Sequence, residues 1–199
     1  MNGSDLTTSM LWYGYTQGAF PMTMDDGQVD WFQPRMRALL PISGIRVSRS
    51  LWRVIRQGQF EIRFDTAFRD VMRGCLRPTD NWISEDFVRV YGQAHDDGWA
   101  HSVECWRGNS LVGGVYGLAI GRAFCAESMF HREANASKVA LWALVERCRA
   151  LGFQIVDAQI MNPHLQSLGA FEIPHAEYMR ALGAALRNET EWSRLRCLA

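Results

Sequence analysis

The sequence contains a single lysine, Lys138, and its other basic side chains are arginines. Lysine and arginine together number 21, which equals the 21 aspartates and glutamates, so the formal net charge is zero. Composition therefore gives no sign of a nucleic-acid partner, and any contact with phosphates would need a local basic patch. Arginine suits such a patch because its planar guanidinium donates paired hydrogen bonds, although a GC-rich coding sequence would produce the same bias.

The sequence also lacks the cysteine spacing of a disulfide-rich or zinc-binding protein. Its five cysteines are an odd number, and none forms a C-x-x-C pair. No stretch approaches the roughly 20 apolar residues of a membrane span. The segment Met1 to Met10 contains Asp5 and no basic residue, unlike a signal peptide. We therefore expect a cytoplasmic protein with reduced thiols, no membrane segment, no metal and no cofactor.

Glycine and proline divide the chain into two parts. They recur so often between Tyr15 and Pro41 that only short strands and turns fit there. A basic helix is predicted next, with Ser48 as its N-cap and Gly58 as its end. We therefore predict a small N-terminal domain over residues 1–58 and a larger domain over residues 59–199.

The second part alternates between strand and helix signals. Asp65 and Ser84 are predicted to cap two helices. The segments that follow are expected to form three strands joined by tight turns, a long helix, a buried strand and a final helix: Ala100 to Arg107, Leu111 to Ile120, Ala123 to Met129, Ser137 to Ala150, Gln154 to Gln159, and the segment after Pro174. This order predicts an α/β (α+β) fold with a mixed sheet, and it resembles the core of acetyltransferase-like folds.

Short blocks between Tyr15 and Tyr178 occur together in an order that is typical of one family. The blocks are Tyr15-Thr-Gln-Gly18-Ala-Phe20-Pro21; Trp31, Pro34, Arg37 and Pro41; Trp82-Ile83 and Tyr91; His101-Ser-Val-Glu104-Cys-Trp106; Leu111-Val-Gly-Gly-Val-Tyr-Gly117; Phe124-Cys-Ala-Glu127-Ser-Met-Phe130; Asn135-Ala-Ser-Lys138; Asp157-Ala-Gln159; His164-Leu-Gln-Ser-Leu-Gly-Ala170; and Ile173-Pro174. On these blocks the chain resembles the leucyl/phenylalanyl-tRNA–protein transferases. It departs from the usual family pattern at Asn81, Ala126 and His175.

The resemblance implies a small N-terminal domain beside an acetyltransferase-like domain. It also implies an aminoacyltransferase that takes Leu, Phe or sometimes Met from aminoacyl-tRNA. The acceptors would be proteins that begin with Lys or Arg, and the product would be marked for degradation by the N-end rule. The family is cytoplasmic and uses no metal, and we expect a monomer.

Asp157 and Gln159 are the catalytic candidates that the resemblance implies. They lie two apart on a predicted strand, so both side chains are expected on one face. An aminoacyl ester is already activated, so the main task is to hold the attacking amine against its carbonyl. The amide oxygen of Gln159 can accept an N–H from that amine, and Asp157 could hold the geometry. The alternative is a strand-end Asp that caps a turn beside an exposed Gln.

Further candidates concern the aminoacylated 3′ end of the tRNA. Phe124 and Met129 are candidates to line a pocket for Leu or Phe, whereas Val115 reads better as a core residue. Trp31 and Trp106 are candidates to stack on the terminal adenosine, although each could fill a domain interface instead. Glu127 could bind a ribose hydroxyl or the substrate amine, or it could face solvent.

A basic face is predicted on the helix near Ser48. Arg49, Arg53 and Arg56 share one side of it and could contact phosphates of the tRNA without reading sequence. A solvated helix face competes closely with this interpretation.

Two other functions remain open. One is an acetyl-CoA-dependent acetyltransferase, which the segment before the long helix disfavours because His131 to Ser137 contains no glycine to cradle a pyrophosphate. The other is a non-catalytic module that binds tRNA or proteins, which the retained Asp157 and Gln159 argue against.

Overall fold

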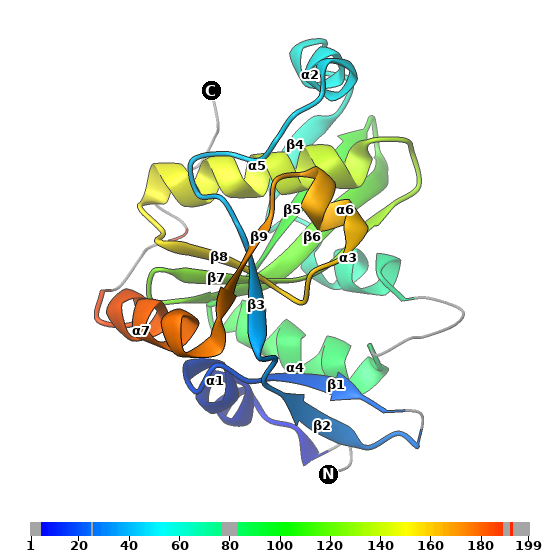
Figure 1. Ribbon diagram of the computed structural model, residues 1–199. Coiled ribbons are helices and arrows are strands. Elements are labelled where there is room, and N and C mark those ends of the chain that lie inside the picture. The colour runs from blue at the N-terminus through cyan, green and yellow to red at the C-terminus, as the bar shows by residue number, and fades with distance from the viewer. Residues whose placement is uncertain (1–4, 25, 77–82, 189–191, 193–199) are drawn as a thin grey trace.

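The computed structural model describes residues 5–24, 26–76, 83–188 and 192, and Figure 1 shows their arrangement. The residues Asn81 and Trp82 lie outside these ranges. In chain order the elements are α1 (Thr8–Thr16), β1 (Phe20–Thr23), β2 (Val29–Phe32), β3 (Met36–Leu40), α2 (Arg49–Arg56), β4 (Glu61–Phe64), α3 (Phe68–Gly74), α4 (Glu85–Asp96), β5 (Ala100–Arg107), β6 (Ser110–Ile120), β7 (Ala123–His131), α5 (Ala136–Leu151), β8 (Ile155–Gln159), α6 (Pro163–Ser167), β9 (Phe171–Pro174) and α7 (His175–Ala185).

A mixed seven-stranded sheet forms the centre of the molecule, in the order β4-β5-β6-β7-β8-β3-β9. Neighbouring strands are antiparallel except β7 and β8, which are parallel. Alternation along β6 assigns the two faces: Val115 packs into the cluster that contains α5, and Tyr116 packs into the cluster that contains α1, α3 and α4. The predicted α/β class is confirmed.

Local signals placed most helix ends correctly. The side chains of Ser48 and Ser84 accept hydrogen bonds from Leu51 N and Phe87 N, so they cap α2 and α4 as expected. Gly152 ends α5 in a left-handed conformation (φ 78°) that suits glycine. The prediction for Asp65 was wrong: Asp65 has φ 59°, and its carboxylate accepts from Ser102 N, so it ties β5 to the loop before α3.

The first residues form a smaller unit of α1 and the β1–β2 hairpin (Figure 1). Helix α1 lies so close to β2 that a Cβ atom on Gly14 would be 1.9 Å from Cζ3 of Trp31. Strand β3 comes before the boundary predicted at Gly58, yet it pairs with β8 and β9 inside the large sheet. The pairing of the strands therefore favours a division just before β3. Among the described residues, no helix has the length and hydropathy needed to cross a membrane.

Candidate functional site

A cavity of about 220 Å³ opens where the parallel strands β7 and β8 stop pairing. Their pairing runs from Ala123↔Ile155 to Cys125↔Asp157. The residues just beyond it, 126–129 on β7 and 158–160 at the end of β8, line the cavity. The end of a parallel pair thus supplies the opening, and the loop into α6 borders it through Asn162, whose side chain caps that helix at Leu165 N.

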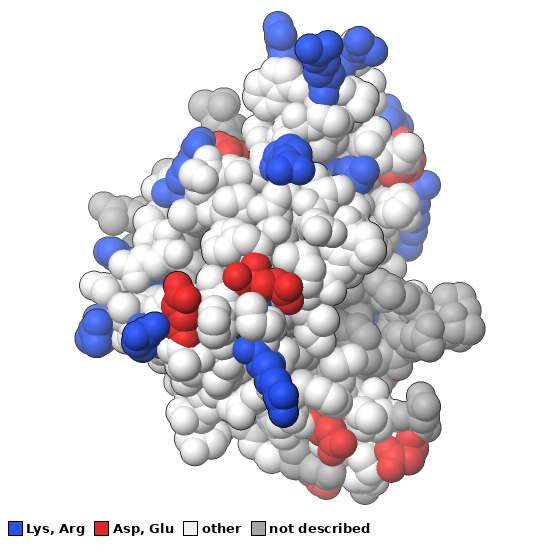
Figure 2. Space-filling model, in the orientation of Figure 1, with Lys and Arg blue, Asp and Glu red and all other residues white. Residues whose placement is uncertain are grey.

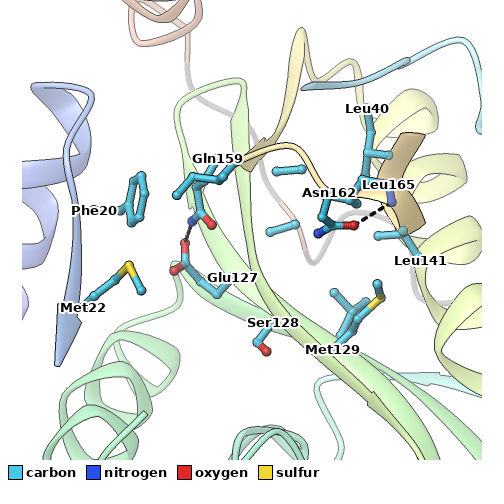
Figure 3. A pocket seen from close by; sticks show the side chains of 14 residues that line it. Phe20, Met22, Leu40, Glu127, Ser128, Met129, Leu141, Gln159, Asn162 and Leu165 are labelled. Carbon is cyan, nitrogen blue, oxygen red and sulfur yellow. Dashed lines mark hydrogen bonds between the residues drawn. The ribbon is translucent and has the colours of Figure 1, made fainter. Parts of the chain in front are cut away.

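Apolar side chains form most of the cavity wall. One side has residues from β3, β6, β7, α5 and α6, namely Leu40, Val115, Met129, Leu141 and Leu165. Phe20 and Met22 of β1 close the opposite side, and Figure 3 shows the two groups facing each other across Gln159 and Glu127. A mostly apolar cavity with a few polar groups at one edge is the usual form of a small-ligand site.

Gln159 ends β8 in a left-handed conformation, with φ 62°. Its Nε2 donates to Oε1 of Glu127 at 2.8 Å, and its backbone N–H donates to Oδ1 of Asp157 at 2.8 Å. The amide oxygen of Gln159 is turned toward the apolar part of the cavity in Figure 3, and it accepts no hydrogen bond from the described residues. An acceptor is therefore available at the cavity edge.

The expectation that Asp157 and Gln159 share a face was wrong. The register of β8 shifts, so Asp157 pairs with Leu39 while Gln159 pairs with the adjacent residue Ala38. Adjacent residues of a strand point to opposite faces, and the extra residue at this irregularity reverses the expected alternation. Asp157 therefore contacts Gln159 through the backbone N–H of Gln159 and not as a neighbour on the same face of the strand.

Asp157 is fully buried and is saturated with hydrogen bonds. It accepts from Arg37 Nε at 2.9 Å and Nη2 at 2.6 Å, and from the hydroxyl of Tyr178 at 2.8 Å. Arg37 is also fully buried, and its Nη1 donates to the carbonyl of Gly18. The guanidinium offsets the cost of burying a carboxylate. The ion pair thus fixes the backbone that presents Gln159.

Glu127 lies in an irregularity of β7 and is 8% exposed. Burial raises the pKa of Glu127 to about 8, and hydrogen bonds from Tyr15 and Gln159 oppose that rise. The hydroxyl of Tyr15 lies 2.8 Å from that of Tyr91, so α1 and α4 both reach the site. Glu127 is therefore a buried carboxyl that anchors Gln159 and is largely protonated near neutral pH.

Two models of one protein family match most of the chain. A model described as leucyl/phenylalanyl-tRNA protein transferase N-terminal domain matches residues 4–35, and one described as leucyl/phenylalanyl-tRNA protein transferase matches residues 39–183. The chain belongs to the leucyl/phenylalanyl-tRNA protein transferase family. It is accordingly an aminoacyltransferase.

Relatives of the same name cover nearly the whole chain. The chain is 50% identical over 183 residues to a leucyl/phenylalanyl-tRNA–protein transferase of Herpetosiphon aurantiacus, covering 92% of this chain and 95% of the relative. The match to that of Chlorobium luteolum is 50% identical and covers 88% and 93%. The match to that of Cereibacter sphaeroides is 45% identical and covers 94% and 89%. The family assignment therefore applies to both units of the fold.

The residues that line the cavity of this transferase differ in part from those predicted from the sequence. Met129 and Val115 both line the cavity. Phe124 does not line it: its ring is 1% exposed and stacks on Trp192 with a centroid distance of 5.2 Å. The reason is position along β7, because Phe124 still pairs with Val156 where the two strands remain joined. Phe20 and Met22 were not predicted, although their alternation on one strand was a usable signal.

The two tryptophans do not meet at the cavity. Trp31 packs on α1 and lines a separate cavity of about 580 Å³ with Tyr13 and Gln17. Trp106 lies near the end of β5, with the guanidinium of Arg63 4.6 Å from its ring centroid. Neither residue lines the cavity beside Gln159, and their stacking on the terminal adenosine stays a prediction.

Arg49, Arg53 and Arg56 are exposed on α2 and form no ion pair with the residues that the structure describes. Figure 2 shows basic side chains gathered over α2, at the upper end of the molecule in that view. The predicted basic face is therefore present, and it is available to a polyanion.

One group of side chains has the composition of a metal site. Asp65, His95 and His101 place ligand atoms within 4.8 Å of one another. These side chains already have protein partners: His101 Nδ1 lies 3.1 Å from Asp65 Oδ2, and His95 Nδ1 lies 2.8 Å from the carbonyl of Ala100. The hydrogen bonds account for this cluster as a structural link between α4, β5 and the loop before α3.

Proposed function

We propose that this transferase moves Leu, Phe or Met from aminoacyl-tRNA to the N-terminal amine of proteins that begin with Lys or Arg. The product would be marked for degradation by the N-end rule, and the reaction would take place in the cytoplasm with the enzyme acting as a monomer. The observation that supports this most is the available amide oxygen of Gln159 at the edge of an apolar cavity.

The cavity suits the side chain of an apolar amino acid. The apolar part of its wall is aliphatic except for Phe20 and the thioethers of Met22 and Met129. Methionine adapts to differently shaped neighbours because its side chain is unbranched and polarisable. One methylene changes binding by only about 1–3 kcal/mol, so such a cavity would accept Leu, Phe and Met rather than one of them.

The proposed chemistry is the attack of an amine on an activated ester. A bond forms between the acceptor nitrogen and the aminoacyl carbonyl carbon, the bond from that carbon to the ribose oxygen breaks, and the proton passes from the amine to that oxygen. Gln159 would accept one N–H of the amine and orient it, because an amide oxygen is too weak a base to remove the proton itself. Positioning of this kind can supply several kcal/mol of the barrier reduction.

The buried groups behind Gln159 would act through it. Asp157 holds the backbone N–H and Glu127 holds the amide N–H₂, so the oxygen cannot swing away from the cavity. Neither carboxyl needs to touch the amine for this role. The basic face of α2 would contact tRNA phosphates and contribute affinity without sequence selection.

A transfer assay tests the proposed function. Labelled leucyl-tRNA is supplied with a peptide that begins with Arg and, separately, with the same peptide beginning with Ala. We expect label on the Arg peptide alone, and a loss of at least about 100-fold in kcat for Gln159→Ala. Asn162→Ala is the matched control, since Asn162 also lines the cavity but only caps α6.

Two results would contradict the proposal. A folded wild-type protein that binds leucyl-tRNA but transfers nothing would indicate a binding module. Near-normal turnover by folded Gln159→Ala would remove the orienting role of that residue while leaving the reaction in place.

A further inference from the structure

Glu172 lies in register with Gln159 across the sheet. Gln159 pairs with Ala38 on β3, and Ala38 pairs with Glu172 on β9. Residues directly opposite each other on paired strands project from the same face, and strands lie about 4.8 Å apart. The Cα atoms of Gln159 and Glu172 are therefore separated by roughly 10 Å, with Ala38 of β3 between them.

The other two carboxyls at this end of the sheet are already engaged. Asp157 is fully buried against Arg37 and Tyr178. Glu127 is buried and accepts from Gln159. Glu172 differs from both, since it is exposed and forms no ion pair or hydrogen bond with any described side chain. A cation that approaches Gln159 from solvent would thus meet Glu172 as the accessible negative charge.

The surface around Glu172 is suited to a peptide. Strand β9 is the edge of the sheet, so one side of its backbone is not paired within it. Two large apolar side chains next to these residues in the chain are exposed: Ile160, which follows Gln159, is 51% exposed, and Phe171, which precedes Glu172, is 46% exposed. Figure 2 shows acidic side chains in the middle of this face, where β3 and β9 run, and the basic side chains of α2 lie away from them.

We propose that Glu172 binds the side-chain cation of the acceptor's N-terminal Lys or Arg while the α-amine of the same residue meets the amide oxygen of Gln159. The separation is of the right order, because an extended Arg side chain places its guanidinium roughly 6 Å from its Cα, against roughly 10 Å between the Cα atoms of Gln159 and Glu172. A carboxylate accepts from either cation, and it pairs with guanidinium in two parallel hydrogen bonds. This assignment rests on the proposed function, since it presupposes a basic N-terminal acceptor.

Charge changes at position 172 test the assignment. Transfer of labelled Leu from tRNA is measured with four peptides that differ only in a first residue of Arg, Lys, Ala or Glu. For Glu172→Gln we expect KM for the Arg and Lys peptides to rise about tenfold, while KM for leucyl-tRNA and kcat at saturating peptide stay near wild type. For Glu172→Lys we expect the preference for Arg over Glu at the first position to fall by about 100-fold or to reverse.

Two matched variants control for general charge effects. Glu177→Gln removes an exposed acid from the first turn of α7, and Asp30→Asn removes one on β2 that pairs with Met22 of the cavity wall. Neither should raise KM for the Arg peptide more than about twofold. Thermal unfolding of each variant checks that the fold is retained.

The outcomes separate the two proposals. If wild-type protein fails to prefer Arg and Lys peptides, the proposed function is wrong. If the wild type has that preference and Glu172→Lys keeps it, or if Asp30→Asn abolishes it instead, the assignment of Glu172 is wrong and the proposed function stands.

Discussion

The two faces of the sheet at β3 and β8 have opposite character. On the α5 face, Leu40 joins an apolar cluster and borders the cavity. On the other face, Arg37 and Asp157 are buried as an ion pair under Tyr178 of α7. Both faces are well shielded from water, yet one borders a cavity and the other contains a buried ion pair. The cavity is therefore shaped by apolar packing, whereas the direction of Gln159 is set by polar groups behind it.

The polar face should be the more costly one to disturb. Removing one partner of a buried ion pair leaves the other charge without compensation. We expect Arg37→Leu to lower the free energy of unfolding by about 3–5 kcal/mol, measured by urea denaturation. Arg63→Leu is the control, because the pair of Arg63 with Glu61 is solvent-exposed and should matter little. Equal losses of unfolding free energy in the two variants would show that the buried pair contributes no more to stability than the exposed pair.

The apolar face should control which amino acid is accepted. Val115 lines the cavity from β6, so Val115→Phe should fill part of it and select against Phe more strongly than against Leu, by about 1–3 kcal/mol in kcat/KM. The matched variant is Val112→Phe, which enlarges a buried side chain on the same strand away from the cavity. It should cost stability without altering the ratio of Leu to Phe transfer. A change of that ratio in both variants would point to a general distortion of the sheet.

The smallest effect, counted per pH unit, is expected from titration of Glu127. Its pKa is about 8 in the folded protein against an ordinary value of 4.5, so the folded state keeps a proton that the unfolded chain releases between these values. Stability should therefore fall as pH rises through this window, by at most about 1.4 kcal/mol per pH unit.

Glu127→Gln removes this titration, so the free energy of unfolding of the variant is the reference for that of the wild type at each pH. The difference in unfolding free energy between wild type and variant should move in favour of the variant as pH rises from about 5 to 8, measured by urea denaturation. A difference that stays constant with pH would mean that Glu127 titrates normally.

The sequence was most informative where structure depends on neighbours along the chain. Ser48 and Ser84 mark helix starts by the hydrogen bonds that their side chains accept, and both were predicted correctly. Alternation located β5, and the tight turns that follow it located β6 and β7. Helix α1 was not predicted, and neither were the short elements α6 and β9.

Features that depend on pairing between distant segments could not be predicted. Alternation predicts a shared face for Asp157 and Gln159, but the register shift against β3 reverses it. Whether Phe124 or Val115 meets the cavity depends on where β7 and β8 stop pairing, and no local pattern records that point. The family resemblance correctly identified the transferase, and it also selected Glu127 and Met129, which the structure brings to the cavity.

The insertion of β3 between β8 and β9 has a consequence for the order of events during synthesis. Arg37 is separated from Asp157 by 120 positions, so at about 5–20 residues per second the ribosome adds β8 roughly 6–24 seconds after β3. Until then β3 has both edges unpaired, which exposes a template for association with other chains. The end of the sheet that holds Gln159 is thus assembled only after β8 and β9 have been synthesised, and a shorter nascent chain lacks the cavity.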